Sequence, residues 1–140
     1  MRDQAIHLKV VGQLAQRDVA LRTVAEACRV VLRTRRTANR RRLLHSVISA
    51  VGEAFNNIAV HGYRDAHPGM VEIDVAVDRR GLAVEMRDYG RSFDPRHATP
   101  PDLDALPESG MGIFIMNEVM DEVDYRPGRP NVLTLVKRLT

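Results

Sequence analysis

The chain has 140 residues, 44% hydrophobic and 28% charged, which is the length and composition of one globular domain. A single cysteine, Cys28, excludes an internal disulfide framework, and the lack of a signal-peptide core or of about 20 consecutive apolar residues predicts a cytoplasmic protein without membrane contact. The net charge of +3 conceals an asymmetry: residues 1–50 carry eleven Lys and Arg against three Asp and Glu, and residues 51–140 carry ten against fifteen.

The N-terminal half reads as one strand and two helices. Residues 6–10 alternate apolar and polar side chains, as a half-buried strand does. Residues 14–32 repeat apolar side chains at three- and four-residue steps, which predicts an amphipathic helix. An arginine-rich connection over 33–42 leads into a second helix from about 38 to 60, and Gly62 follows as its stop signal. The apolar stripe of this second helix comprises Leu43, Leu44, Val47, Ile48, Val51, Phe55 and Ile58.

The C-terminal half begins with strand chemistry. Residues 71–77 and 82–87 alternate on either side of a turn at 79–81, which predicts an antiparallel hairpin. Residues 91–109 hold four of the seven prolines and show no sustained periodicity. A loop of this length inside a compact domain is usually functional.

A short helix over 111–120 and two strands over 121–126 and 131–138 complete the predicted elements. The sequence shows neither an internal repeat nor a second domain, so residues 1–140 are expected to form one unit. The predicted fold class is α+β: a two-layer sandwich with helices on one face of a mixed, mostly antiparallel sheet.

The second helix carries the first candidate for chemistry. Glu53, Asn57 and His61 are spaced four residues apart, so they form one stripe that points away from the apolar stripe. Carboxylate and amide oxygens suit a hard cation such as Mg²⁺, and the carboxylate is also a candidate proton acceptor. The alternative is an ordinary solvated helix face.

Two further motifs lie at the ends of the long loop. Asp88-Tyr89-Gly90 ends a strand, where the carboxylate can accept a hydrogen bond from a ligand amine and the glycine allows close approach. Ser109-Gly110-Met111-Gly112 precedes a helix, whose first N–H groups favour an anion such as phosphate. An ordinary strand-ending turn and a hinge capped by Ser109 are the respective alternatives.

The order of these motifs carries a resemblance. In residues 50–63 (AVGEAFNNIAVHGY), 84–95 (VEMRDYGRSFDP) and 109–123 (SGMGIFIMNEVMDEV), the chain resembles the anti-sigma factor serine/threonine kinases of bacterial partner-switching systems. These kinases belong to the histidine-kinase-like (GHKL) ATPase superfamily. The resemblance spans essentially the whole chain, and it implies the Bergerat ATP-binding fold with an ATP lid at about 91–109.

The resemblance also implies roles for residues of the first two motifs. Glu53 would activate the hydroxyl of a protein substrate. Asn57, rather than Asn56, would bind Mg²⁺, because it falls four residues after Glu53. Asp88 would receive the amino group of adenine, and Gly90 would lie against the base.

The third motif would hold the phosphates of ATP. Gly110 and Gly112, with Met111 between them, would bracket the phosphates at the end of the lid. His61 stands where the family often has histidine, and its role is either packing or contact with the nucleotide. Two positions depart from the family pattern: Ser92 replaces the second glycine of D-x-G-x-G, and Glu108 stands where some members have a basic residue.

The implied function is an anti-sigma factor and kinase that binds MgATP, sequesters a sigma factor and phosphorylates its STAS-type antagonist, acting as a homodimer. The alternative is an ATP-responsive anti-sigma or adaptor module without phosphotransfer. Direct nucleic-acid binding by residues 33–42 is disfavoured, because no aromatic side chain falls within the run. The same run is instead predicted to dock an acidic protein partner.

Overall fold

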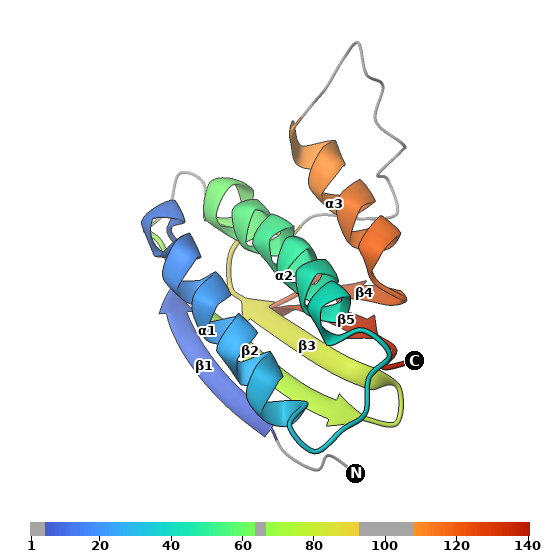
Figure 1. Cartoon of the computed structure of the whole chain (residues 1–140). Coiled ribbons are helices and arrows are strands. Elements are labelled where there is room, and N and C mark those ends of the chain that lie inside the picture. Colours follow the sequence, from blue (N-terminus) through green and yellow to red (C-terminus); the bar gives the residue numbers. More distant parts are fainter. Residues whose placement is uncertain (1–4, 64–66, 93–107) are drawn as a thin grey trace.

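The computed structural model describes residues 5–63, 67–92 and 108–140, with the backbone alone described for 108–111. The predicted lid therefore lies largely outside the described residues. Five strands form one sheet in the order β1-β2-β3-β5-β4, and the helices cover one of its faces (Figure 1). The strands are β1 (Ala5–Val11), β2 (Met70–Asp78), β3 (Gly81–Asp88), β4 (Glu122–Arg126) and β5 (Asn131–Lys137). The helices are a 3₁₀ turn (Leu14–Gln16), α1 (Arg17–Val31), α2 (Arg40–Asn56), a π-helical turn (Asn57–Gly62) and α3 (Glu108–Val119).

This two-layer arrangement confirms the predicted α+β class. One detail differs, because every strand pair among the described residues is antiparallel and the sheet is not mixed. The hairpin of β2 and β3 turns through Arg79 and Arg80 into Gly81, whose φ of 134° is one that a side chain would strain. A Cβ at Gly81 would also overlap the carbonyl of Lys137 on β5.

The core lies between the sheet and the helices. Its largest fully buried side chains come from both layers and include Phe55, Leu32, Ile73, Leu82, Met86, Met116 and Leu135. The predicted stripe of α2 is largely confirmed, although Leu44 and Ile48 are only partly buried. The helix begins at Arg40 rather than at residue 38, because the side chain of Asn39 caps it by accepting from the N–H of Arg42.

One helix approaches the length and composition of a membrane-spanning helix, which the sequence analysis does not predict. The continuous helix over Arg40–Gly62 is long enough to span a bilayer, and an 18-residue window of it has a mean hydropathy of 1.2. Half of that window is buried inside the protein, where α2 packs on the sheet, α1 and α3. A central core helix has these same properties, so the segment is weak evidence for a membrane span.

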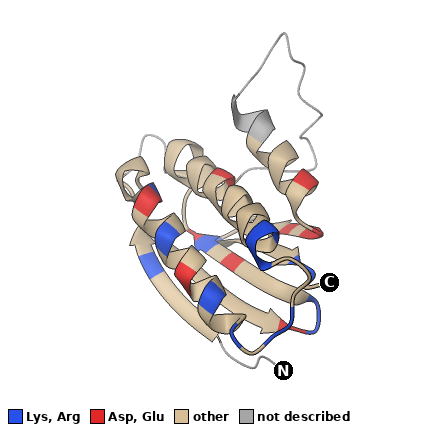
Figure 2. Cartoon of the chain, viewed as in Figure 1, with Lys and Arg blue, Asp and Glu red and all other residues tan. Residues whose placement is uncertain are grey.

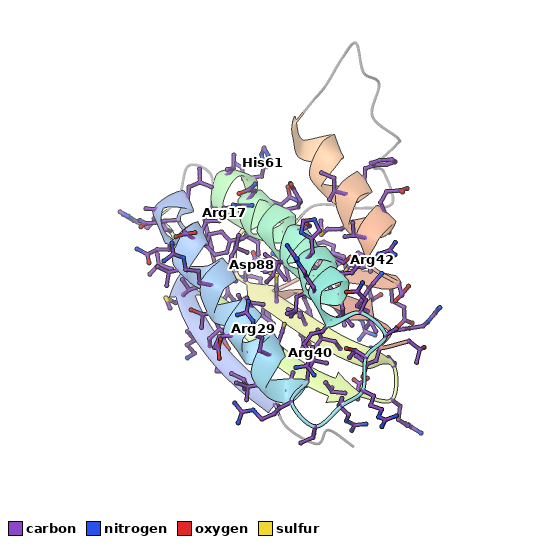
Figure 3. All side chains as sticks on the ribbon, in the orientation of Figure 1. Arg17, Arg29, Arg40, Arg42, His61 and Asp88 are labelled. Carbon is purple, nitrogen blue, oxygen red and sulfur yellow. The ribbon has the colours of Figure 1, made fainter. Side chains whose placement is uncertain are left out.

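The charge asymmetry of the sequence has a spatial counterpart. Figure 2 shows basic residues gathered around the junction of α1 and α2. Arg40 is exposed, and its Nη2 donates to the carbonyl of Leu32 at 3.0 Å, which joins the connection to the end of α1. Arg41 and Arg42 are exposed, and Figure 3 shows Arg42 pointing outward at the beginning of α2. Arg33 and Arg36 are exposed as well, so the arginine run predicted from the sequence lies at the surface.

The uncovered face of the sheet carries acidic, basic and small apolar side chains. A hollow of about 540 Å³ lies on this face, and none of the predicted site residues lines it. Its floor is formed by the small side chains of Ala76 and Ala83, which pair across β2 and β3. Its rim includes Asp74, Glu85, Glu122 and Asp124.

Candidate active site

The stripe of α2 predicted from the sequence does line one pocket. A pocket of about 350 Å³ is bounded by Leu14, Glu53, Asn56, Asn57, Val60 and His61. The α-helix changes at Asn57 into a π-helical turn, a feature that is often found at functional sites. Figure 3 shows His61 at this end of the domain, close to the beginning of α1 where Arg17 lies. The three predicted residues of the stripe therefore share one surface.

Asn57 is the most telling residue of this pocket. Only 8% of its surface is exposed, and its Nδ2 is the one buried side-chain nitrogen or oxygen among the described residues that has no hydrogen-bond partner. A buried polar atom without a partner is costly, since its desolvation is not compensated. An amide held in this state is suited to a polar ligand, and this explanation is more economical than an ordinary packing role. The side chain is not part of a solvated helix face.

The glycine motif meets this stripe from the other side. A Cβ built on Gly112 would lie 3.3 Å from Oε2 of Glu53 and 3.5 Å from both terminal atoms of the Asn57 amide. Gly112 thus brings the backbone of α3 directly against the two polar side chains. Any side chain at this position would fill the space between α2 and α3.

The position of the glycines differs from the prediction. The helix α3 begins at Glu108 and not at Met111, so Gly110 and Gly112 lie in its first turns rather than in a turn before it. The first N–H groups of a helix lack acceptors within the helix, and Gly110 remains among them. The side chains of Ser109 and Met111 lie outside what the structure describes.

Asp88 is the buried acid of the site. It ends β3 on the face covered by the helices, and only 4% of its surface is exposed. Its Oδ1 accepts the N–H of Gly90 at 2.9 Å and Nδ2 of Asn131 at 3.1 Å. Burial raises the pKa of Asp88 above its ordinary value, and these two hydrogen bonds offset part of the rise. The environment therefore disfavours the charge without abolishing the acceptor.

Two glycines allow the end of β3 to touch the π-helical turn. A Cβ at Gly90 would overlap the carbonyl group of Gly62, and the N–H of Arg91 donates to that same carbonyl at 2.6 Å. A Cβ at Gly62 would lie 3.7 Å from Oδ1 of Asp88. The neighbour that requires a glycine at position 90 is therefore the protein backbone, and the predicted approach of a ligand to Gly90 stays a prediction.

Tyr63 holds the two halves of the site together, and the sequence analysis missed it. Its hydroxyl donates to the carbonyl of Met70 at 2.9 Å and accepts the N–H of Tyr89 at 3.0 Å. These bonds join the end of the π-helical turn to the beginning of β2 and the end of β3. Burial raises the pKa of the Tyr63 hydroxyl, so it stays protonated and can donate at physiological pH.

Asn131 is the second residue that the sequence analysis missed. It is fully buried and contacts Asp88. A signal was available in the strand NVLTLVK, where Asn131 has the same parity as the buried Leu133 and Leu135. A polar side chain on the inward face of a strand requires partners, and here one of them is the candidate acid.

The donor set fits a magnesium nucleotide in its chemistry. Glu53 and Asn57 offer carboxylate and amide oxygens, the unpartnered amide faces the pocket region, and Gly112 leaves room between the helices. Among the described residues, no group of three or more His, Cys, Asp or Glu side chains is placed to hold a metal ion. The protein side chains alone thus form an incomplete coordination shell, as is usual for Mg²⁺ bound together with phosphates.

Comparisons with known proteins agree with this geometry. The family model for the histidine kinase-like ATPase domain matches residues 15–137. The anti-sigma F factor of Anoxybacillus flavithermus is 31% identical over 106 residues, covering 69% of this chain and 70% of that protein. The serine/threonine-protein kinase BtrW of Bordetella bronchiseptica is 30% identical over 102 residues, covering 69% of each chain.

A solved structure supports the fold independently. The histidine kinase domain from the blue-light activated histidine kinase of Erythrobacter litoralis EL346 superposes with a TM-score of 0.57 at 17% identity. The match covers 88% of this chain and 61% of that one. At this identity the likeness shows the fold alone.

Proposed function

This chain belongs to the histidine kinase-like ATPase domain family, and from this premise we propose that it binds ATP with Mg²⁺ and transfers the γ-phosphate to a serine or threonine of a protein partner. The observation that carries the proposal is the meeting of Gly112 with two polar side chains of α2 that are far from it in the sequence. Gly112 on α3 lies against Glu53 and against the unpartnered amide of Asn57. This meeting leaves a backbone-lined space beside a carboxylate, as phosphoryl transfer to a hydroxyl requires.

The base and the phosphates would bind at the two ends of the site. Asp88 would accept a hydrogen bond from the amino group of adenine. Gly90, which donates its N–H to Asp88 and packs on the backbone of Gly62, would lie against the base. Gly110, Met111 and Gly112 receive the phosphates near the beginning of α3, where the helix dipole favours an anion. Asn57 holds Mg²⁺, which when bound neutralises charge on the phosphates. His61 lines the rim of the same pocket.

Glu53 is proposed as the catalytic residue. Its carboxylate orients the acceptor hydroxyl and takes its proton as the oxygen bonds to the γ-phosphorus. The bond from that phosphorus to the bridging oxygen breaks, and ADP leaves with the electron pair. Because the product carries added negative charge, the phosphorylated partner would bind less tightly to a surface chosen for the neutral form.

The partners follow from the names of the relatives. A relative that is 31% identical is called an anti-sigma F factor, which supports a sigma factor as one partner of this chain in the cytoplasm. The phosphorylated protein would be its STAS-type antagonist. The exposed Arg40, Arg41 and Arg42 form the basic surface for an acidic protein, and charge reversal at the three positions should weaken the binding of at least one partner in a pull-down. The uncovered sheet face, whose hollow is lined by both acidic and basic side chains, is available to a second copy in a homodimer.

The central test separates chemistry from binding. Glu53→Gln keeps the size and polarity of the side chain but removes the proton acceptor, so phosphate incorporation into the antagonist from labelled ATP should fall by at least about 100-fold. The affinity for ADP, measured by calorimetry, should change less than about threefold. Asn56→Ala, at a neighbouring pocket residue, is the matched control and should leave phosphorylation within about threefold of the parent. Full phosphorylation by Glu53→Gln would remove Glu53 from the catalytic role.

A binding module without phosphotransfer is the second candidate function. It is favoured by Glu108, an acid at the beginning of α3 where some family members have a basic residue. The parent protein then binds ATP and the sigma factor but transfers no phosphate to any candidate antagonist. The same labelled-ATP assay distinguishes the two functions, because nucleotide binding is expected under both.

A further inference from the structure

Asn131 is buried at a point where an apolar residue would be expected. It is the first residue of β5, it has no exposed surface, and it pairs in register with Asp88 on β3. The next inward-facing residues of the strand are Leu133 and Leu135, which belong to the core. A polar amide in this place is retained only where its hydrogen bonds are complete.

The amide of Asn131 is fully engaged. Its Nδ2 donates both hydrogens, to Oδ1 of Asp88 at 3.1 Å and to the carbonyl of Gly90 at 2.9 Å. Its Oδ1 accepts the N–H of Gly128 at 3.0 Å and the hydroxyl of Ser92. A flipped amide would place an NH₂ group against the Gly128 N–H and an oxygen against two acceptors, so only one orientation satisfies the network.

The network fixes the orientation of the Asp88 carboxyl group. Both described donors to Asp88, the Gly90 N–H and Asn131 Nδ2, use Oδ1. Within the described ranges, no residue donates to Oδ2. The carboxylate is therefore held by one oxygen, and the other oxygen remains as the acceptor for a ligand.

The network also explains a departure from the family pattern. Ser92 replaces the second glycine of the D-x-G-x-G motif, and its hydroxyl donates to Oδ1 of Asn131. The residue that the sequence analysis could interpret only as a loss of glycine thus contributes a hydrogen bond. That bond fixes the same amide that fixes Asp88.

We propose that Asn131, supported by Ser92, is a positioning residue that aims Oδ2 of Asp88 at the 6-amino group of a purine and so sets the preference for adenine over 6-oxopurine nucleotides. This inference rests on the proposed nucleotide function. A 6-oxo group presents an acceptor to the carboxylate acceptor, and two acceptors without a hydrogen between them repel. The preference depends on the aim of Oδ2, which a freely rotating carboxylate does not maintain.

The test compares ADP with IDP, which differ at the 6-position of the base. The Kd of each is measured by calorimetry, and the ratio of the two is the readout. We expect Asn131→Ala to raise the Kd for ADP by about tenfold while the Kd for IDP changes less than about twofold, so that the ratio collapses. Ser92→Ala should lower the ratio by about two- to threefold, because Asn131 keeps its other bonds. Thr134→Ala, on the outward face of the same strand, should leave it unchanged.

A purely structural role gives a different result. It lowers the melting temperature of Asn131→Ala but leaves the ratio of the two Kd values as in the parent, and that outcome overturns the inference. If Asn131→Ala does not fold, Asn131→Asp keeps the volume of the side chain and replaces the donor by an acceptor. The preference of this variant for ADP over IDP should be lost in the same way. An unchanged ratio of the two Kd values would count against the proposed role of Asn131. A parent protein that binds neither nucleotide instead overturns the proposed function itself.

Discussion

Asp88 on β3 and Asp74 on the neighbouring strand β2 lie on opposite faces of one sheet, in opposite electrostatic surroundings. Asp88 faces the helices, and its described donors are a backbone N–H and a neutral amide. Asp74 lies on the uncovered face, where it accepts from Nη1 of Arg87 at 2.7 Å and from the ring of His7. Partial burial opposes the charge of Asp74, but the bonds from Arg87 and His7 outweigh it and lower its pKa. Burial raises the pKa of Asp88.

The difference distinguishes a carboxylate that serves the fold, Asp74, from Asp88, which we propose binds a ligand. On the outer face, Arg87 also contacts Glu85 at 3.0 Å and Glu72 at 3.4 Å, so one guanidinium joins three carboxylates on two strands. On the inner face, no described cation contacts Asp88, and one of its oxygens receives no described hydrogen bond. An acid that is left unneutralised at a buried position costs stability, and such a cost is typical of functional sites.

Among the substitutions that test this difference between Asp88 and Asp74, Asp88→Asn should have the largest effect. We expect the affinity for ADP to fall by at least about 100-fold, because the base amine loses its acceptor to an amide that can present a donor instead. The free energy of unfolding without nucleotide should stay constant or rise by about 1 kcal/mol. Because the pKa of Asp88 is raised in the folded protein, its contribution to stability is complete below the pKa of the unfolded carboxyl and is lost as the pH rises through the folded-state pKa. At neutral pH the ionised carboxylate therefore opposes folding.

Calorimetry and urea unfolding measure these two effects on the same sample. Asp124→Asn, on the exposed strand β4, removes a charge of the same kind and should change neither quantity appreciably. A marked loss of stability in Asp88→Asn, comparable with that of a core mutation, would contradict the assignment of Asp88 as a residue that serves the ligand.

Arg87→Leu should have the opposite pattern. The substitution leaves Asp74, Glu85 and Glu72 facing one another without their shared cation, so the free energy of unfolding should fall by about 1 kcal/mol. The affinity for ADP should stay within about twofold of the parent. Arg126→Leu, which breaks one exposed pair at 3.3 Å, is the matched control with a smaller effect. Equal losses for the two variants would mean that the network adds nothing beyond a single surface pair.

The smallest expected effect concerns stability in acid. Because the pKa of folded Asp74 lies below its ordinary value of 3.8, its contribution to stability is present above that pH and is lost as the pH falls through the folded-state pKa. Asp74→Asn should therefore flatten the acid side of the stability curve by a few tenths of a kcal/mol. Thermal unfolding between about pH 5 and pH 3 measures this slope. A slope identical to that of the parent would place the acid sensitivity at other carboxylates.

Much of the fold could be predicted because the hydrophobic period changes clearly along the chain. The strands at 71–77 and 82–87 and the helix beginning near 38 all agree with the structure to within about two residues. The glycine motif was predicted to precede its helix, and the prediction was wrong by three residues. Glycine usually marks a helix boundary, but here it lies inside the helix because Gly112 must pass Glu53 and Asn57 at close range.

The candidate site was predictable only along single elements. The helical spacing of Glu53 and Asn57 was visible, and they do line one pocket. The roles of Tyr63 and Asn131 could not be predicted because their partners are distant in the sequence. Tyr63 forms a hydrogen bond with residue 89, and Asn131 forms one with residue 88. No local period indicates which two strands will be neighbours. Only the order β3-β5-β4 brings the end of β3 to the beginning of β5.

That strand order has a consequence for how the protein is made. Asp88 and Asn131 are 43 residues apart, so the proposed base site is complete only after β5 has docked on β3. Pairing over such a separation forms late, because the loop must close before the contact stabilises it. A ribosome-bound chain that still lacks β5 therefore has its acid but not the amide that aims it. Nucleotide binding to a chain that is still being synthesised would then indicate that β5 has docked on β3.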